Sequence, residues 1–63
     1  MRIRIDRHSR IDLRWDGEAA VWIATSGDVP GLVLEDRSLM ALLRRVRQAV
    51  PTLLELNFDK ARP

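Results

Sequence analysis

Residues 21–34 read VWIATSGDVPGLVL, and this stretch decides the fold because two apolar runs meet in it through a turn. Pro30-Gly31 suits the two central positions of a type II turn, in which proline presets a negative φ and glycine accepts a positive one. The chain is therefore expected to turn back on itself, with strands over residues 20–25 and 32–34 as antiparallel neighbours.

A further strand is predicted immediately before this stretch. Residues 11–15 alternate apolar and charged side chains, which is typical of a strand with one buried face. Asp16-Gly17 follows, and an Asp-Gly pair between apolar runs is a strong hairpin signal because the glycine adopts the positive φ of a primed turn. The three strands together form an antiparallel meander.

The period of the apolar residues changes to that of a helix after this meander. Ser38 is the expected N-cap, with Asp36 as the competing candidate. Asn57 is a suitable C-terminal stop, and residues 58–63 are expected to be a loose tail. The stripe that faces the sheet recurs at steps of three and four residues and consists of Leu39, Leu42, Leu43, Val46, Val50, Leu53 and Leu54.

The chain of 63 residues is predicted to be a single α+β domain, a three-stranded antiparallel meander packed on one C-terminal helix. Its core spans about residues 11–57. Residues 1–10 alternate Ile3 and Ile5 with charged residues, which makes them an extra strand or an arm. The chain has no apolar leader and no stretch of membrane-spanning length, so a cytoplasmic location is expected.

Catalysis is not predicted. The sequence has no Cys and one His, which excludes disulfides and thiolate metal sites. In the meander, Asp12, Asp16, Glu18 and Asp28 do not converge on a magnesium site, and His8 has no partner at a recognisable spacing. No phosphate-binding or nucleophile motif is present. We therefore expect no enzymatic activity, no metal and no cofactor.

Charge is segregated along the chain in a way that the net charge of +2 conceals. Residues 1–14 carry five Arg and two Asp, and residues 37–63 carry six basic and two acidic residues. Residues 15–36 between them carry five carboxylates and no Lys or Arg. Such asymmetry steers a partner of opposite sign, although solvated faces and self-association of basic ends with the acidic middle explain it equally well.

The strand over residues 20–25 is apolar on both faces, whereas one helix can cover only one of them. Trp22 faces opposite Val21 and Ile23, so one of these sets must point away from the helix. Either Trp15 and Trp22 are both core residues, or one of them lies in an interface. The simplest explanation is that a second subunit or another partner covers whichever of these side chains points away from the helix.

Nucleic-acid binding is the least favoured of the binding functions. Arg44 and Arg47 are the candidate phosphate contacts, but Arg45 points away from them on a helical wheel. No recognised nucleic-acid-binding module or aromatic stacking platform accompanies these arginines. A solvated helix back is the simpler interpretation.

The sequence resembles the small HicB-related family of bacterial domains over about residues 11–57. The resemblance lies in blocks that occur in order, namely WDGEA (15–19), VWIATS (21–26), DVPGL (28–32), Glu35 and PTLLELN (51–57). It implies a β-β-β-α unit, a partial RNase H-like HicB fold that is not catalytic and commonly self-associates. In HicB antitoxins this domain binds and occludes a small mRNA-cleaving HicA toxin, and a separate C-terminal domain binds operator DNA. This sequence ends at Pro63 without that second domain, so DNA binding by this chain alone is not expected.

The functional hypothesis is a non-enzymatic HicB-like antitoxin, or a protein-binding module derived from one, of a bacterial type II toxin-antitoxin system. It is expected to be a homo-oligomer that holds a small basic HicA-like toxin. A stand-alone oligomerisation or small-ligand-sensing domain is the alternative, followed by a nucleic-acid-binding protein. The residues expected at the partner or oligomer interface are Trp15, Trp22, Asp28, Val29, Pro30, Gly31 and Leu32.

Overall fold

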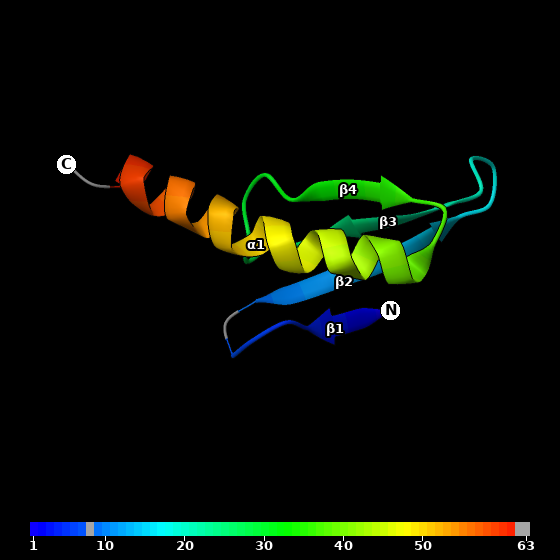
Figure 1. Cartoon of the computed structure of the whole chain (residues 1–63), viewed down its shortest axis with the longest axis horizontal. Helices are drawn as coiled ribbons and strands as arrows, with labels where there is room; N and C mark the ends of the chain where they lie inside the picture. The colour runs from blue at the N-terminus through cyan, green and yellow to red at the C-terminus, as the bar shows by residue number, and fades with distance from the viewer. Residues whose placement is uncertain (8, 62–63) are drawn as a thin grey trace.

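In the computed structural model, four antiparallel strands form one sheet, and a helix packs on one face of it (Figure 1). The structure describes residues 1–7 and 9–61, with the backbone alone for residues 58–61. The strands follow the order of the chain across the sheet. The elements are β1 (Arg2–Arg4), β2 (Arg10–Asp16), β3 (Val21–Thr25), β4 (Val33–Asp36) and α1 (Leu39–Ala61). The predicted α+β class is confirmed.

The prediction of three strands is wrong, because residues 2–4 form β1 at the edge of the sheet. Of the two alternatives for residues 1–10, an extra strand or an arm, the structure has the strand. β1 pairs antiparallel with β2, with Ile3 opposite Ile11. The pairing extends to the first residue: the Met1 ammonium donates to the Leu13 carbonyl at 2.8 Å, and the Leu13 amide donates to the Met1 carbonyl at 2.6 Å. Ile3 packs against the core. A run this short becomes a strand because β2 supplies its hydrogen bonds.

The predicted β2–β3 hairpin is present, but its turn differs from the prediction. The loop between the strands has four residues, and the residue with positive φ is Ala20 (φ 57°), not Gly17. Asp16 shapes the loop instead, because its Oδ1 accepts the amides of Glu18 at 3.0 Å and Ala19 at 3.3 Å. The Asp side chain thus closes the turn, and the loop places its left-handed residue at an alanine.

The predicted turn at Pro30-Gly31 has the expected geometry. Gly31 has φ +88°, and the amide of Leu32 donates to the carbonyl of Val29 at 3.2 Å. Both Val29 and Leu32 are buried in the core. The side-chain amide of Asn57 donates to the Pro30 carbonyl at 3.1 Å, so the helix holds the turn from one side.

Helix α1 begins as predicted and ends later than predicted. The Ser38 hydroxyl accepts the amide of Ala41 at 3.2 Å, as an N-cap does, while Asp36 Oδ1 accepts the Ser38 amide at 2.9 Å. The helix continues through Asn57 to Ala61, so residues 58–61 are helical and not a loose tail. Residues 62–63 lie outside the described residues. Asn57 does not stop the helix because its side chain bonds to the Pro30 loop.

The core lies between α1 and the inner face of the sheet, the face that carries Ile11, Leu13 and Ala24. The opposite face, here called the outer face, carries no helix (Figure 1). Residues alternate between the two faces along each strand. The outer face carries Arg2 and Arg4 of β1, Arg10, Asp12, Arg14 and Asp16 of β2, Val21, Ile23 and Thr25 of β3, and Val33 and Glu35 of β4. The buried apolar residues are Ile11, Leu13, Ala24, Val29, Leu32, Leu42, Val46 and Val50.

Candidate partner-binding site

Two tryptophans lie side by side at the end of the sheet where α1 begins. Trp15 and Trp22 are cross-strand partners on the inner face, with ring centroids 5.4 Å apart and planes inclined at 60°. Trp22 is partly buried and packs against the core, whereas Trp15 is 49% exposed. An indole that is half exposed and braced by a second one is a rigid apolar surface with little side-chain entropy left to lose on binding.

Three acidic residues lie at the same end of the sheet as this pair, because the register brings them there from three segments, with Asp16 on the outer face. Asp16 follows Trp15, Asp36 lies opposite Trp22 on β4, and Glu18 is exposed in the hairpin. Backbone amides hold Asp16 and Asp36 in place. A hollow lined by Arg14, Trp15, Asp16, Gly17 and Glu18 opens beside the hairpin. We call Trp15, Trp22, Asp16, Glu18 and Asp36 the tryptophan site.

The chemistry of the tryptophan site suits a cation with an apolar stem. A guanidinium or ammonium group over an indole face is attracted by the ring quadrupole, and nearby carboxylates add charge-assisted hydrogen bonds. Trp and Arg are also the residues on which protein interfaces most often depend for affinity. The site thus has the composition that recognises Arg or Lys side chains of another protein.

The second part of the predicted interface lies at the other end of the sheet, in the loop between β3 and β4. Asp28 fastens this loop to β2 through hydrogen bonds. Its Oδ2 accepts the Arg10 backbone amide at 2.9 Å, and its own backbone amide donates to the Ser26 hydroxyl at 3.1 Å. The side chains of Val29 and Leu32 are buried, while Pro30 and Gly31 are exposed. The structure therefore separates the predicted residues into two places and buries two of them.

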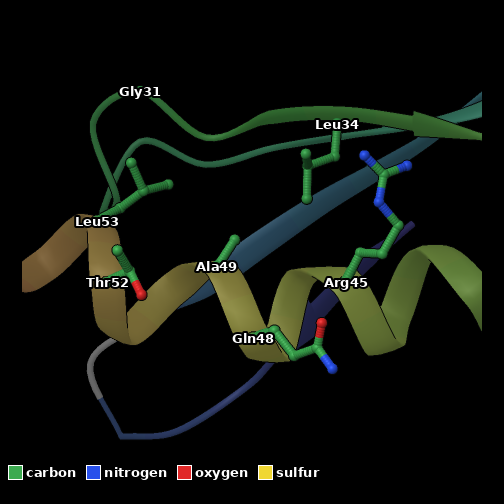
Figure 2. Close-up of a pocket in the computed structure, with 7 residues that line it drawn as sticks. All are labelled: Gly31, Leu34, Arg45, Gln48, Ala49, Thr52 and Leu53. Carbon is green, nitrogen blue, oxygen red and sulfur yellow. The ribbon is translucent and has the colours of Figure 1, made fainter.

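An open groove between β4 and α1 was not predicted. Figure 2 shows Leu34 reaching from β4 toward the helix and Leu53 lying beneath the Gly31 turn. Arg45 closes one end, since its guanidinium donates to the Glu35 carbonyl at 2.8 Å and lies 3.5 Å from the Asp36 carboxylate. The lining residues are Gly31, Leu34, Arg45, Gln48, Ala49, Thr52 and Leu53. They come from sequence positions far apart, so no local pattern could reveal the groove.

The arginines divide between two sides of the molecule. Arg44 and Arg47 are exposed on the helix, away from Arg45, and the arginines of β1 and β2 lie on the outer face of the sheet. Arg2 is 2.7 Å from Asp12, and this hydrogen bond raises the pKa of its guanidinium. Arginine is charged at every physiological pH, so the raised pKa of Arg2 causes no pH dependence of stability in the usual range.

In the part of the chain that the structure describes, no three His, Asp or Glu side chains gather where they could hold a metal ion. His8 lies outside the described residues, so the expectation that it has no catalytic partner stays a prediction. Nor does any described helix carry an apolar stretch of the length that crossing a bilayer requires.

The fold and the site define a small α+β domain with one helix-covered sheet face, one open face and an aromatic pair of which Trp15 is exposed. A family model described as a domain of unknown function, DUF1902, matches residues 8–62, and the chain belongs to this family. Neither the curated proteins nor the solved structures gave a match.

Proposed function

We propose that this chain is a non-enzymatic, HicB-like antitoxin, or a protein-binding module derived from one, that holds a small basic toxin at the tryptophan site. The observation that carries this proposal is the exposure of Trp15, 49% of which remains open although Trp22 braces it. A large indole left open in so small a domain favours an interface role over a packing role.

The surrounding charge supports a basic partner. Asp16, Glu18 and Asp36 bring carboxylates to the indole pair, and Arg45 lies 3.5 Å from only the last of them. An Arg side chain of a partner would stack on Trp15 while its guanidinium meets Glu18. Truncation of a central aromatic anchor of this kind typically costs 2 kcal/mol or more, which corresponds to roughly 30-fold in affinity.

The proposal expects a gene for a small basic HicA-like toxin beside the gene for this chain, and the test uses that toxin in a catalytically inactive form. The absence of such a neighbouring gene would favour a stand-alone domain. Titration calorimetry would compare the unchanged chain with Trp15→Ala and Glu18→Lys. We expect each substitution to weaken binding by at least about 10-fold, and co-expression of Trp15→Ala to lose protection against the active toxin. Met40→Ala is the matched control, because Met40 is an apolar residue with 72% exposure on the helix and outside the site.

Two results would overturn the proposal. The first is no binding between the unchanged chain and the toxin at micromolar concentration. The second is binding that Trp15→Ala leaves unaltered, which would remove the tryptophan site from the interface. Circular dichroism spectra of both variants separate loss of binding from loss of fold.

A stand-alone oligomerisation domain is the second candidate function, and the uncovered outer face favours it. Val33 is 67% exposed there, and Ile23 occupies the middle of the face. This candidate predicts self-association with no toxin partner. Self-association belongs to both candidates.

A further inference from the structure

One cross-strand row on the outer face combines a base, an apolar residue and an acid. Arg14 on β2 lies opposite Ile23 on β3, and Ile23 lies opposite Glu35 on β4. Arg14 and Glu35 are exposed, and Ile23 is partly buried. The row therefore presents an apolar centre with opposite charges on its two sides.

In the part of the chain that the structure describes, no ion pair joins the two charges of this row. They are separated by the width of β3, which places their strands about 10 Å apart. Among the described residues, the ion pairs formed by side chains join Arg2 to Asp12 and Arg45 to Asp36, and neither involves this row. Arg14 and Glu35 are thus available to a partner.

We propose that two copies of this chain pack outer face to outer face about a two-fold axis that runs along β3. Such an axis places Ile23 of one copy against Ile23 of the other, and Arg14 of each copy against Glu35 of the other. Facing sheets lie about 10 Å apart, a distance that an Arg and a Glu side chain can bridge together. The row is self-complementary, as an isologous interface requires.

The neighbouring rows agree with the same axis. Val21 and Thr25 also lie on the outer face of β3, so each meets its own copy near the axis. Val33, which is 67% exposed on β4, lies in the row of Thr25 and falls over Asp12 on β2 of the second copy. The packing would bury the second apolar side of β3, which the helix leaves open.

Other occupants of this face are less favoured by the described residues. Both tryptophans lie on the inner face, so the outer face offers nucleic-acid bases no indole for stacking. Asp12, Asp16 and Glu35 interrupt its arginines, which repels phosphate. Addition of a strand at β4 is opposed by Arg45, which already binds the Glu35 carbonyl at that edge.

This inference deepens the self-association within the proposed function, and its test needs no toxin. Sedimentation equilibrium over a concentration series would give the dissociation constant of the dimer. We expect Arg14→Glu and Glu35→Arg each to raise this constant at least about 10-fold, because each creates two like-charge contacts per dimer. The double variant R14E/E35R restores the opposite charges and is expected to return within about 3-fold of the unchanged chain. Ile23→Glu is expected to give a monomer.

Arg44→Glu is the matched control, since it makes the same charge change on the exposed back of the helix and should leave the constant unchanged. A monomer at all concentrations of the unchanged chain would overturn the proposal, as would a double variant no tighter than the single ones. An Ile23→Glu variant that dimerises with an unchanged dissociation constant would also overturn the proposal. Toxin binding that fails while the charge exchange succeeds would refute the tryptophan site alone. Thermal unfolding of each variant checks that it folds.

Discussion

Among the described residues, two have a left-handed backbone conformation, Ala20 and Gly31, and replacing each by the other residue type should change the stability of the fold in opposite directions. Gly31 has φ +88° and Ala20 has φ 57°, and these are the residues with positive φ in the described part of the chain. We predict that Gly31→Ala destabilises the fold and that Ala20→Gly stabilises it. The two residues lie at opposite ends of the sheet, so their effects should add.

The magnitudes follow from the local geometry. A residue with a Cβ in the left-handed region costs about 1–2 kcal/mol, whereas alanine in place of glycine stabilises by about 0.4–1 kcal/mol through the unfolded chain. A Cβ at Gly31 would meet Leu53 Cδ2 at 3.6 Å, which is ordinary contact, so no clash adds to the cost. The net effect is about 1 kcal/mol of destabilisation for Gly31→Ala and a similar gain for Ala20→Gly.

Urea and thermal unfolding followed by tryptophan fluorescence would measure these changes at one fixed protein concentration. For a chain of this size 1 kcal/mol corresponds to about 4–8 °C in Tm. Gly27→Ala is the control, because Gly27 has no positive φ and an added Cβ meets nothing within 4 Å, so it should stabilise slightly. Equal shifts for Gly31→Ala and Gly27→Ala, or a lower Tm for Ala20→Gly, would refute the conformational argument.

Two further predictions concern serines. Ser9 is buried, and its hydroxyl has no hydrogen-bond partner among the described residues, so Ser9→Ala should raise the free energy of unfolding by about 1 kcal/mol in urea titrations. A loss of stability would show that the hydroxyl is satisfied. Ser38→Ala removes the acceptor of the Ala41 amide and should lower the free energy of unfolding by about 1 kcal/mol, whereas Ser38→Asp should retain most of it. Equal effects of these two substitutions would contradict the capping role.

Local signals account for the parts of the fold that sequence reasoning predicted. The turn at Pro30-Gly31, the alternation over residues 11–15 and the cap at Ser38 each depend on residues within a few positions of one another. Their conformations follow from φ preferences, side-chain period and capping. Such features need no knowledge of distant contacts.

The mistaken predictions involve distant contacts. Residues 1–10, for which both an extra strand and an arm were left open, contain a strand because β2 pairs with it. The helix continues through Asn57, whose side-chain amide reaches the Pro30 carbonyl. Gly17 was expected to be the hairpin residue with positive φ. In the structure that residue is Ala20, in a loop whose backbone amides at Glu18 and Ala19 donate to the Asp16 carboxylate. In each case the deciding hydrogen bonds involve residues that were not part of the sequence pattern from which the prediction was made.

The candidate site shows the same division. Local patterns in the sequence establish the strands β2 to β4, the Pro-Gly turn, the helix with its apolar stripe, and the two apolar sides of β3, because these features depend on composition and period. Only the tertiary structure decided that Trp22 faces the helix and Ile23 faces away, that Val29 and Leu32 are core residues, and that Trp15 pairs with Trp22. The physical reason is that the choice of covered face and the register between strands depend on where the helix packs, and that is a property of the whole chain.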